Sequence, residues 1–393
     1  MTLDLAERAG LIEPSATLAM GAEAKRLKSQ GLEILDFALG EPDFDTPVNI
    51  QEAALRAIRA GKTHYTPPAG IAELRQAVAD HYTRQEGLPT EMNQVVVSNG
   101  AKHSIHNALM AVCGPGDEVI IPAPYWVSYS DLVKLTGAKP VVLATTESSG
   151  FKLTPQQFLD AVTPRSRLLM INSPSNPTGM AYDADELRDH GEVLRKHPEL
   201  MIATDDMYEH IVWKPGRFVN ILNVCPDLYD RTIVLNGVSK AYSMTGWRIG
   251  YAAGPAGLIE AMASIQSQST SNPTSISQIA AEAALNGDQS CIGEMVNAFK
   301  ERQDYVVRAL NAIPGIECLA TDGTFYVLPN VQGAIERVPG VSDDLGLAEY
   351  LIERGVAVVP GSAFGAAGHL RLSIATSLAN LEKALERIEQ ALA

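Results

Sequence analysis

The sequence predicts an α/β fold built around a mainly parallel β-sheet. In the middle of the chain, short apolar runs rich in β-branched residues alternate with stretches of helical periodicity such as 101–112 and 183–196. The runs are apolar throughout, which is typical of strands that are covered on both faces. We predict strands at 95–98, 118–122, 140–143, 168–172, 201–204 and 232–236. Because ligands collect at the carboxyl ends of such strands, residues that directly follow a strand are the first candidates for a functional site.

The two ends of the chain predict a second, smaller domain. Helical periodicity dominates from 255 to about 312, and a final helix is expected over 378–392 with Ser377 as its N-cap. The apolar face of that helix consists of Leu378, Leu381, Leu385 and Ile388. Short strand-like pieces lie at 325–328, 356–359 and 370–374. The expected division is a large domain at 46–285 and a small α+β domain at 1–45 and 286–393.

Composition and charge exclude several classes of protein. Of the 393 residues, 46% are apolar and 20% are charged, which is ordinary for a globular protein and argues against a disordered or fibrous chain. The net charge of −15 repels phosphate backbones and anionic lipids, so we expect neither nucleic acid nor a membrane as a partner. A local basic pocket for a small anion stays compatible with this charge.

The sequence also predicts the compartment. No apolar run approaches the roughly 20 residues of a membrane span, and the N-terminus carries Asp4 and Glu7 where a signal peptide has its apolar core. The four cysteines are far apart, at Cys113, Cys225, Cys291 and Cys318. They form no CxxC or zinc-finger pattern. We therefore expect a cytoplasmic protein with free thiols and no metal site.

The strongest chemical motif follows the last of the six predicted strands. Residues 236–250 read NGVSKAYSMTGWRIG, in which Lys240 is an amine in a polar loop and Arg248 offers a cation eight residues later. An amine nucleophile beside an anion-binding arginine suits a cofactor that has both a carbonyl and a phosphate, such as pyridoxal 5′-phosphate. Taken singly, each residue would more often be a solvated lysine or a salt-bridged arginine.

With this motif the sequence resembles the fold-type I pyridoxal-phosphate aminotransferases of class I, most closely their bacterial aspartate aminotransferase branch. The resemblance extends from Pro14 to Arg371. It implies a seven-stranded sheet flanked by helices, a small domain that closes over the substrate, and pyridoxal 5′-phosphate as cofactor. It also implies ping-pong transfer of an amino group between an L-amino acid, aspartate or glutamate, and a 2-oxo acid, 2-oxoglutarate or oxaloacetate.

The resemblance assigns three catalytic residues. Lys240 matches the lysine that binds the cofactor covalently and moves a proton at the substrate Cα, which requires a lowered amine pKa. Asp205 matches the carboxylate paired with the pyridine nitrogen, and Tyr208 matches the phenol that donates to the ring hydroxyl oxygen. Asp206 stands where the family usually has glutamate, outside the matched positions. Without this pattern, Asp205 would equally suit the N-cap of a helix.

A phosphate site is implied where the strand at 95–98 meets the next helix. Gly100 and Ala101 match the backbone positions that cradle the phosphate at the N-terminus of the helix. Ser239 and Arg248 match further phosphate contacts.

The remaining matched positions concern the cofactor ring and the substrate. Trp126 matches the aromatic residue that stacks on the pyridine ring and reaches the substrate carboxylate. Asn176 matches the amide that binds the ring hydroxyl and the substrate carboxylate. Arg371 matches the clamp for the α-carboxylate, a bidentate role that lysine cannot fill. Gly40 matches the backbone that closes over the same carboxylate.

Tyr65 matches the tyrosine that reaches the phosphate of the neighbouring subunit. The resemblance therefore implies a homodimer with shared active sites.

An acidic substrate needs a second cation for its distal carboxylate. Residues 249–299 contain no lysine or arginine, so the cation that some relatives take from this region is absent. In the bacterial branch a lysine at the position of Lys102 fills the role, with Ser15 and Thr17 as hydrogen-bonding partners. If Lys102 is only a phosphate counterion, a preference for aromatic or neutral amino acids is expected. Glu13 stands where some relatives are basic, which disfavours bulky dicarboxylates such as prephenate.

Two other functions share these motifs. A β-eliminating C–S lyase or a cyclopropane-forming synthase uses the same scaffold and the same catalytic residues. A cofactor-sensing regulator also resembles this chain, but it needs a winged-helix domain before the aminotransferase part. The pattern at 63–70 and 123–128 favours transamination.

Overall fold

The computed structural model describes residues 5–12, 14–213 and 218–393. Its centre is a seven-stranded sheet in the order β2-β8-β7-β6-β5-β3-β4. The strands are β2 (Val95–Ser98), β3 (Glu118–Ala123), β4 (Lys139–Ala144), β5 (Ser166–Asn172), β6 (Met201–Asp205), β7 (Thr232–Gly237) and β8 (Gly250–Ala253). The predicted α/β class and mainly parallel sheet are confirmed, and each of the six predicted strands lies within two residues of its observed bounds.

The strand that sequence analysis did not find is β8. It runs antiparallel to both of its neighbours, β2 and β7. Its four residues, Gly-Tyr-Ala-Ala, lack the β-branched side chains that mark the other strands. Because β8 reverses direction on both sides, β2 points the same way as β7, and the carboxyl end of β2 joins those of β7, β6, β5 and β3 at one edge of the sheet.

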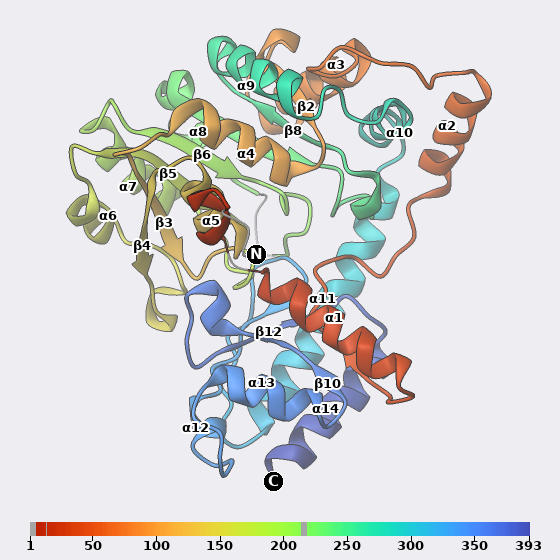
Figure 1. Cartoon of the computed structure of the whole chain (residues 1–393), viewed down its shortest axis with the longest axis vertical. Helices are drawn as coiled ribbons and strands as arrows, with labels where there is room; N and C mark the ends of the chain where they lie inside the picture. Colours follow the sequence, from red (N-terminus) through yellow and green to blue (C-terminus); the bar gives the residue numbers. More distant parts are fainter. Residues whose placement is uncertain (1–4, 13, 214–217) are drawn as a thin grey trace.

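Helices cover both faces of this sheet (Figure 1). Along β5, Leu169 and Ile171 pack into one buried apolar cluster, while Leu168 and Met170 pack into another on the opposite face. Burial on both faces explains why the strands read as continuous apolar runs. The α-helices between β1 and α11 are α2 (Val48–Arg59), α3 (Ala72–His81), α4 (Ala101–Val112), α5 (Ser128–Leu135), α6 (Pro155–Ala161), α7 (Ala184–Arg195), α8 (Ile221–Val224), α9 (Ala256–Ser269) and α10 (Ser275–Asn286).

A small α+β domain joins the two chain ends in the lower part of Figure 1. Strand β1 (Leu35–Asp36) pairs in parallel with β10 (Val356–Ala357), so segments more than 300 residues apart lie side by side. A three-stranded antiparallel sheet has the order β11-β12-β9. The other elements are α1 (Ala16–Ser29), α11 (Ser290–Ala312), β9 (Tyr326–Val327), α12 (Gln332–Ile335), α13 (Asp344–Ile352), β11 (Val359–Pro360), β12 (Leu370–Ser373) and α14 (Leu378–Leu392).

The final helix forms as the sequence predicts. Ser377 Oγ accepts a hydrogen bond from the backbone N–H of Asn380 at 3.3 Å, which caps α14. Leu381, Leu385 and Ile388 are buried in the core of the small domain, and Leu378 packs at its border. This apolar stripe fixes the C-terminus against the α+β layer.

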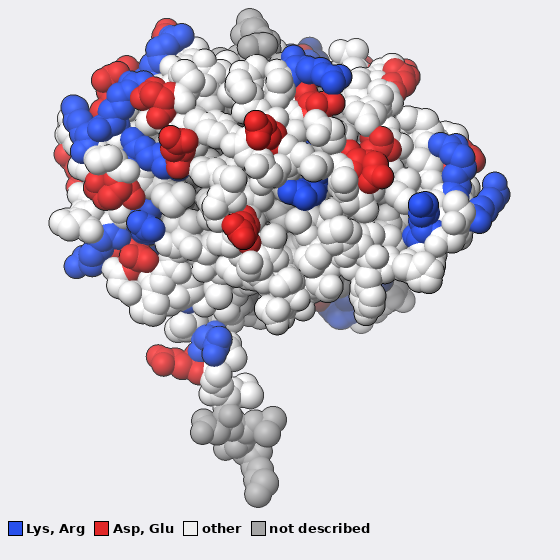
Figure 2. Space-filling view, turned by 90° about the horizontal axis from the view of Figure 1, so that it is seen from above, with Lys and Arg blue, Asp and Glu red and all other residues white. Residues whose placement is uncertain are grey.

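The structure gives the state of the cysteines and the distribution of charged side chains on one face of the molecule. All four cysteines are free. Acidic and basic side chains are interspersed over the face shown in Figure 2, with wide uncharged areas between them. No helix in the described part of the chain is both long enough and apolar enough to span a membrane.

Candidate active site

A pocket of about 380 Å³ opens at the edge of the sheet where the parallel strands end. Most of the residues singled out from the sequence line it: Gly40, Ala101, Lys102, Trp126, Asn176, Asp205, Tyr208, Ser239, Lys240, Arg248 and Arg371, with Ser15 and Thr17. They come from segments across the whole chain, and they converge because the carboxyl ends of β2, β3, β5, β6 and β7 share one edge.

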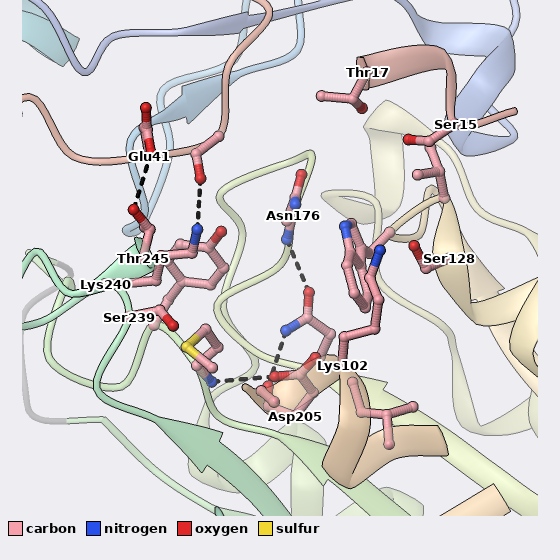
Figure 3. A pocket seen from close by; sticks show the side chains of 18 of the residues that line it. Ser15, Thr17, Glu41, Lys102, Ser128, Asn176, Asp205, Ser239, Lys240 and Thr245 are labelled. Atoms are coloured by element: carbon pink, nitrogen blue, oxygen red, sulfur yellow. Dashed lines mark hydrogen bonds between the residues drawn. The ribbon is translucent and has the colours of Figure 1, made fainter. Parts of the chain in front are cut away.

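Lys240 lies at the centre of one side of this pocket (Figure 3). Its Nζ donates to the carbonyl oxygen of Gly40 at 2.5 Å, so the loop after β7 touches the small domain. Burial lowers the pKa of Lys240 to about 8; the carboxylate of Glu41 opposes this shift, and the guanidinium of Arg371 adds to it. An amine with this pKa is partly neutral near pH 7.5 and can act as a nucleophile.

Asp205 ends β6 on the floor of the pocket and is buried. Its Oδ2 accepts a hydrogen bond from the Tyr129 hydroxyl at 2.5 Å, and its Oδ1 accepts one from the Met207 N–H at 3.2 Å. Burial raises the pKa of Asp205, and the Tyr129 and Met207 hydrogen bonds and the Lys240 charge offset only part of that rise. Among the residues that the structure describes, no basic side chain forms a salt bridge with this carboxylate, and a protonated ring nitrogen would supply a close cation.

Tyr208 lies beyond Asp205 on the same loop. Its hydroxyl donates to the hydroxyl of Tyr326 at 3.0 Å, and both phenols are buried. Tyr326 belongs to β9 of the small domain, so this bond joins the two domains at the pocket.

A phosphate-sized anion fits the start of α4. Gly100 has a φ of 85°, and a side chain there would collide with the guanidinium of Arg248. The first amides of the helix, at Ala101 and Lys102, have no intrahelical acceptor. Arg248 Nη1 donates to the carbonyl oxygen of Thr245 at 2.9 Å, which holds the guanidinium beside this helix end. Backbone donors and a fixed cation thus converge, as phosphate binding requires.

On the opposite side of the pocket, Lys102 lies with its Nζ 4.8 Å from the centre of the Trp126 ring. Partial burial, together with the charge of Arg248, lowers the pKa of Lys102. Figure 3 shows Ser15 and Thr17 on this side of the pocket. Ser15 is the N-cap residue of α1, yet its side chain makes no capping hydrogen bond.

Arg371, on β12, is 1% exposed. Its Nη2 donates to the carbonyl oxygen of Ala38 at 2.5 Å, and its Nη1 donates to Asn176 Oδ1 at 3.3 Å. Its Nε makes no hydrogen bond, and among the described residues no carboxylate pairs with it. A buried guanidinium of this kind is costly unless an anion joins it, so the site is suited to a ligand carboxylate.

Two residues considered in the sequence analysis lie elsewhere. Tyr65, between α2 and α3, is 92% exposed and does not line the pocket of its own chain. Glu13 lies outside the described residues.

Tyr129, Tyr326 and Glu41 line the pocket but were not singled out from the sequence. Tyr129, in the first turn of α5, follows Trp126 by three positions, and the two rings pack edge-on with their centres 5.5 Å apart; this short spacing from a predicted residue could have drawn attention to it. Tyr326 sits in a two-residue strand with no local motif. Glu41 follows the predicted Gly40 and accepts a hydrogen bond from the Thr245 hydroxyl at 2.9 Å (Figure 3).

The model of the family described as "Aminotransferase class I and II" matches residues 33–388. The chain belongs to this family. It is a transaminase, and the family implies pyridoxal 5′-phosphate as its cofactor. The fold-type I resemblance drawn from the sequence is confirmed.

Named relatives of this transaminase cover nearly the whole chain. It is 53% identical to the aspartate/prephenate aminotransferase of Nitrosomonas europaea over 98% of the chain and 99% of that relative. The crystal structure of the Rhizobium meliloti aspartate aminotransferase superposes with a TM-score of 0.96 at 47% identity, covering 100% of this chain and 99% of that one. The Thermus thermophilus aspartate aminotransferase, solved with maleate, gives 0.93 at 41% identity, with 99% and 100% covered.

The residues of this transaminase fit the cofactor that its family implies. The buried carboxylate of Asp205 needs a cationic partner, and the amine of Lys240 is partly neutral. The helix N-terminus at Gly100, beside Arg248, is suited to bind an anion. These three features correspond to the ring nitrogen, the aldehyde and the phosphate of pyridoxal 5′-phosphate.

Proposed function

We propose that this transaminase moves an amino group between aspartate or glutamate and the corresponding 2-oxo acids, oxaloacetate and 2-oxoglutarate. The observation that carries this proposal is that Arg371 and Lys102, two of the basic residues that line one pocket, have no other role in binding the cofactor ring. Arg371 suits the α-carboxylate, and Lys102 beside Trp126 suits the distal carboxylate. The names of the relatives and the dicarboxylate maleate in the Thermus thermophilus structure support it.

The residues that would hold the cofactor follow from the geometry. Gly100, Ala101, Ser239 and Arg248 would bind the phosphate, with Lys102 beside them. Trp126, Asn176, Asp205 and Tyr208 would contact the ring and its substituents. Pyridoxal 5′-phosphate supplies an aldehyde that accepts the amino group and a ring that withdraws electrons from the substrate Cα.

The protein then supplies orientation and proton transfer. Arg371 and Lys102 hold the two ends of the substrate, which fixes its Cα toward Lys240. The neutral amine of Lys240 would take the proton from the Cα of the amino donor, and in the second half-reaction the protonated amine would deliver a proton to the Cα of the new amino acid. Burial raises the pKa of Asp205 and the Tyr129 hydrogen bond lowers it in part; once ionised, this carboxylate would favour a protonated ring nitrogen.

We further propose domain boundaries at 46–285 for the large domain and 1–45 with 286–393 for the small domain. Contacts between the two occur at the pocket, where Gly40 meets Lys240 and Arg371 meets Asn176. They also occur away from it, where Trp213 Nε1 donates to the carbonyl oxygen of Thr321 at 2.7 Å. A substrate carboxylate on Arg371 would draw the small domain over the site and exclude water.

We also propose a homodimer in which Tyr65 reaches the phosphate site of the partner subunit. Its 92% exposure is large for an aromatic side chain. On the preceding helix, α2, Val48, Leu55 and Ile58 are also exposed. An apolar surface next to an exposed tyrosine suits a contact with a second copy of the chain. Sedimentation of the holoenzyme measures the assembly.

The decisive experiment is the near-visible absorbance of the holoenzyme during one half-reaction. L-aspartate or L-glutamate, added without a 2-oxo acid, is expected to change the absorbance of the bound cofactor, and 2-oxoglutarate is expected to restore it. A spectrum that only another amino acid changes would contradict the substrate assignment. Release of pyruvate and ammonia without any 2-oxo acid would indicate an eliminating lyase.

The role of Lys102 is tested by K102M. Loss of its charge-assisted contact is expected to raise KM for aspartate about tenfold or more, while KM for an uncharged amino acid changes little. K139M, at an exposed lysine on β4, is the matched control and is expected to behave as wild type. Equal losses for acidic and neutral substrates would assign Lys102 to the phosphate instead.

A further inference from the structure

Behind the pocket, Glu209 occupies a buried site that the reaction described above does not use. It directly follows Tyr208 in the chain and is 6% exposed. His81 Nε2, at the end of α3, lies 2.9 Å from Glu209 Oε1. His210 Nε2 lies 3.4 Å from the same oxygen. Two imidazoles from different segments of the chain thus lie close to one carboxylate. No local sequence motif predicts this cluster.

The second oxygen of this carboxylate faces the next strand. Glu209 Oε2 and Asn236 Nδ2 are both buried, and neither makes a hydrogen bond of normal geometry. They are a complementary acceptor and donor, and the Asn236 amide lies close enough to lower the pKa of Glu209. Asn236 Oδ1 accepts the N–H of Gly237 at 2.7 Å, at the end of β7. The cluster therefore reaches the strand end that leads into Lys240.

The charge of the cluster favours an ionised Glu209. Burial alone would raise its pKa, but the imidazoles of His81 and His210 outweigh burial, so the net pKa lies below the usual value. Asp206 is different, because burial raises its pKa well above the usual value despite bonds from Thr204 and Asn220. Of these two carboxyl groups, Glu209 is the one whose pKa lies below the usual value.

The loop between these groups is short and internally bonded. Asp206 N–H donates to the carbonyl oxygen of Leu235 at 2.9 Å, which joins β6 to β7 directly before the cluster. Glu209 N–H donates to the carbonyl oxygen of Asp206 at 2.9 Å. His210 packs edge-on against Tyr242, two residues after Lys240, with ring centres 6.2 Å apart. We therefore expect a movement of Glu209 to displace two loops, the one that carries Asp205 and Tyr208 and the one that carries Lys240.

We propose that Glu209, held by His81 and His210, is a positioning residue. It fixes the position of the loop that carries Asp205 and Tyr208 relative to the loop that carries Lys240. This proposal rests on the roles given above to Asp205, Tyr208 and Lys240. It adds a buried support to the site that touches neither substrate nor cofactor.

The test is E209Q, which keeps the size of the side chain but places an amide donor among imidazole donors. We expect kcat for amino transfer to fall about ten- to a hundredfold, with KM for aspartate within about twofold of wild type. The apoprotein is expected to bind pyridoxal 5′-phosphate about tenfold more weakly. The visible circular dichroism of the bound cofactor is expected to diminish, because the ring sits less firmly.

The matched control is H190Q. His190 is 2% exposed on α7 and packs edge-on against Phe158 and Tyr182, away from both catalytic loops. It is expected to lower the melting temperature and to leave kcat and the dichroism within twofold of wild type. H210N, at a partly exposed partner of Glu209, provides a milder test if E209Q does not fold, and the same readouts are expected to fall.

Three outcomes would overturn the proposal. One is a folded E209Q, or an H210N used in its place, with the cofactor affinity and dichroism of wild type. Another is an H190Q that loses kcat as E209Q does. The third is binding of one Zn²⁺ per chain that E209Q abolishes, because the three ligand atoms lie within 4.8 Å of one another and would then form a metal site. Cofactor affinity and dichroism need no substrate, so they test Glu209 even if the aspartate assignment fails.

Discussion

The two walls of the pocket are built differently. The wall at the sheet edge carries Asp205 at the end of β6 and Lys240 in the loop after β7, and these strands of five and six residues are hydrogen-bonded to neighbours and buried on both faces. The wall from the chain ends carries Gly40 and Glu41, in the loop after the two-residue strand β1, and Arg371, within the four-residue strand β12. The first wall holds the groups suited to the cofactor, and the second holds the clamp suited to the substrate. A long sheet suits fixed chemistry, and a small domain suits a part that closes.

The largest effect is expected from K240A, which removes the reactive group of the sheet-edge wall. We expect kcat to fall about a thousandfold or more, because the amine acts as nucleophile and as proton carrier. Thermal stability is expected to be kept, since burying an amine costs free energy. A single-turnover assay with aspartate measures the loss. Retained turnover would remove Lys240 from the mechanism.

R371K tests the wall from the chain ends. Lysine keeps the charge but cannot form the two parallel hydrogen bonds of a guanidinium. We expect KM for aspartate to rise about ten- to a hundredfold with a smaller change in kcat. Steady-state kinetics measure both. A fall in kcat with an unchanged KM would contradict the assignment of substrate binding to the wall from the chain ends.

Y129F sharpens the description of the sheet-edge wall. The Tyr129 hydroxyl lowers the pKa of Asp205 against the raising effect of burial, so its removal is expected to raise that pKa further. Asp205 must be ionised, and the acid limb of the pH profile for kcat is therefore expected to move to higher pH, with kcat at neutral pH about tenfold lower. Y125F, at the neighbouring tyrosine, is the control. An unmoved acid limb would contradict this role.

The smallest effect is expected from E41Q, at the contact between the walls. The Glu41 carboxylate raises the pKa of Lys240, so the variant is expected to lower that pKa and make the neutral amine available at lower pH. Because Glu41 is exposed, we expect at most about a twofold change in rate, and less at high salt. The pH dependence of cofactor incorporation into the apoprotein measures the shift, and E52Q on α2 is its control.

The sequence predicts the sheet-edge wall better than the other wall. Asp205 and Lys240 directly follow apolar runs, so periodicity and motif point to the same place. Strand β8 was missed because Gly250, Ala252 and Ala253 have low strand propensity and form a strand only between two neighbours.

Tertiary contacts decide what the sequence could not predict. Tyr326 reaches Tyr208 across 118 positions of the chain, and Glu209 meets His81 across 128. Such pairs leave no trace in local periodicity. Arg371 was found only through its match to a known family, because a four-residue strand with one arginine is common. Local sequence patterns therefore located the reactive residues, whereas the residues that hold them in place are recognised only in the folded chain.

The loop at 238–249 is closed at its base, because Gly237 and Gly250 pair across β7 and β8. Exposed loops generally tolerate added or deleted residues. Here the loop delivers Lys240 near its entry and Arg248 near its exit, to two different parts of one pocket. An inserted residue would displace at least one of them. Its length is therefore more tightly constrained than the identity of most residues within it, and an engineer who wishes to reshape the pocket should leave this segment uncut.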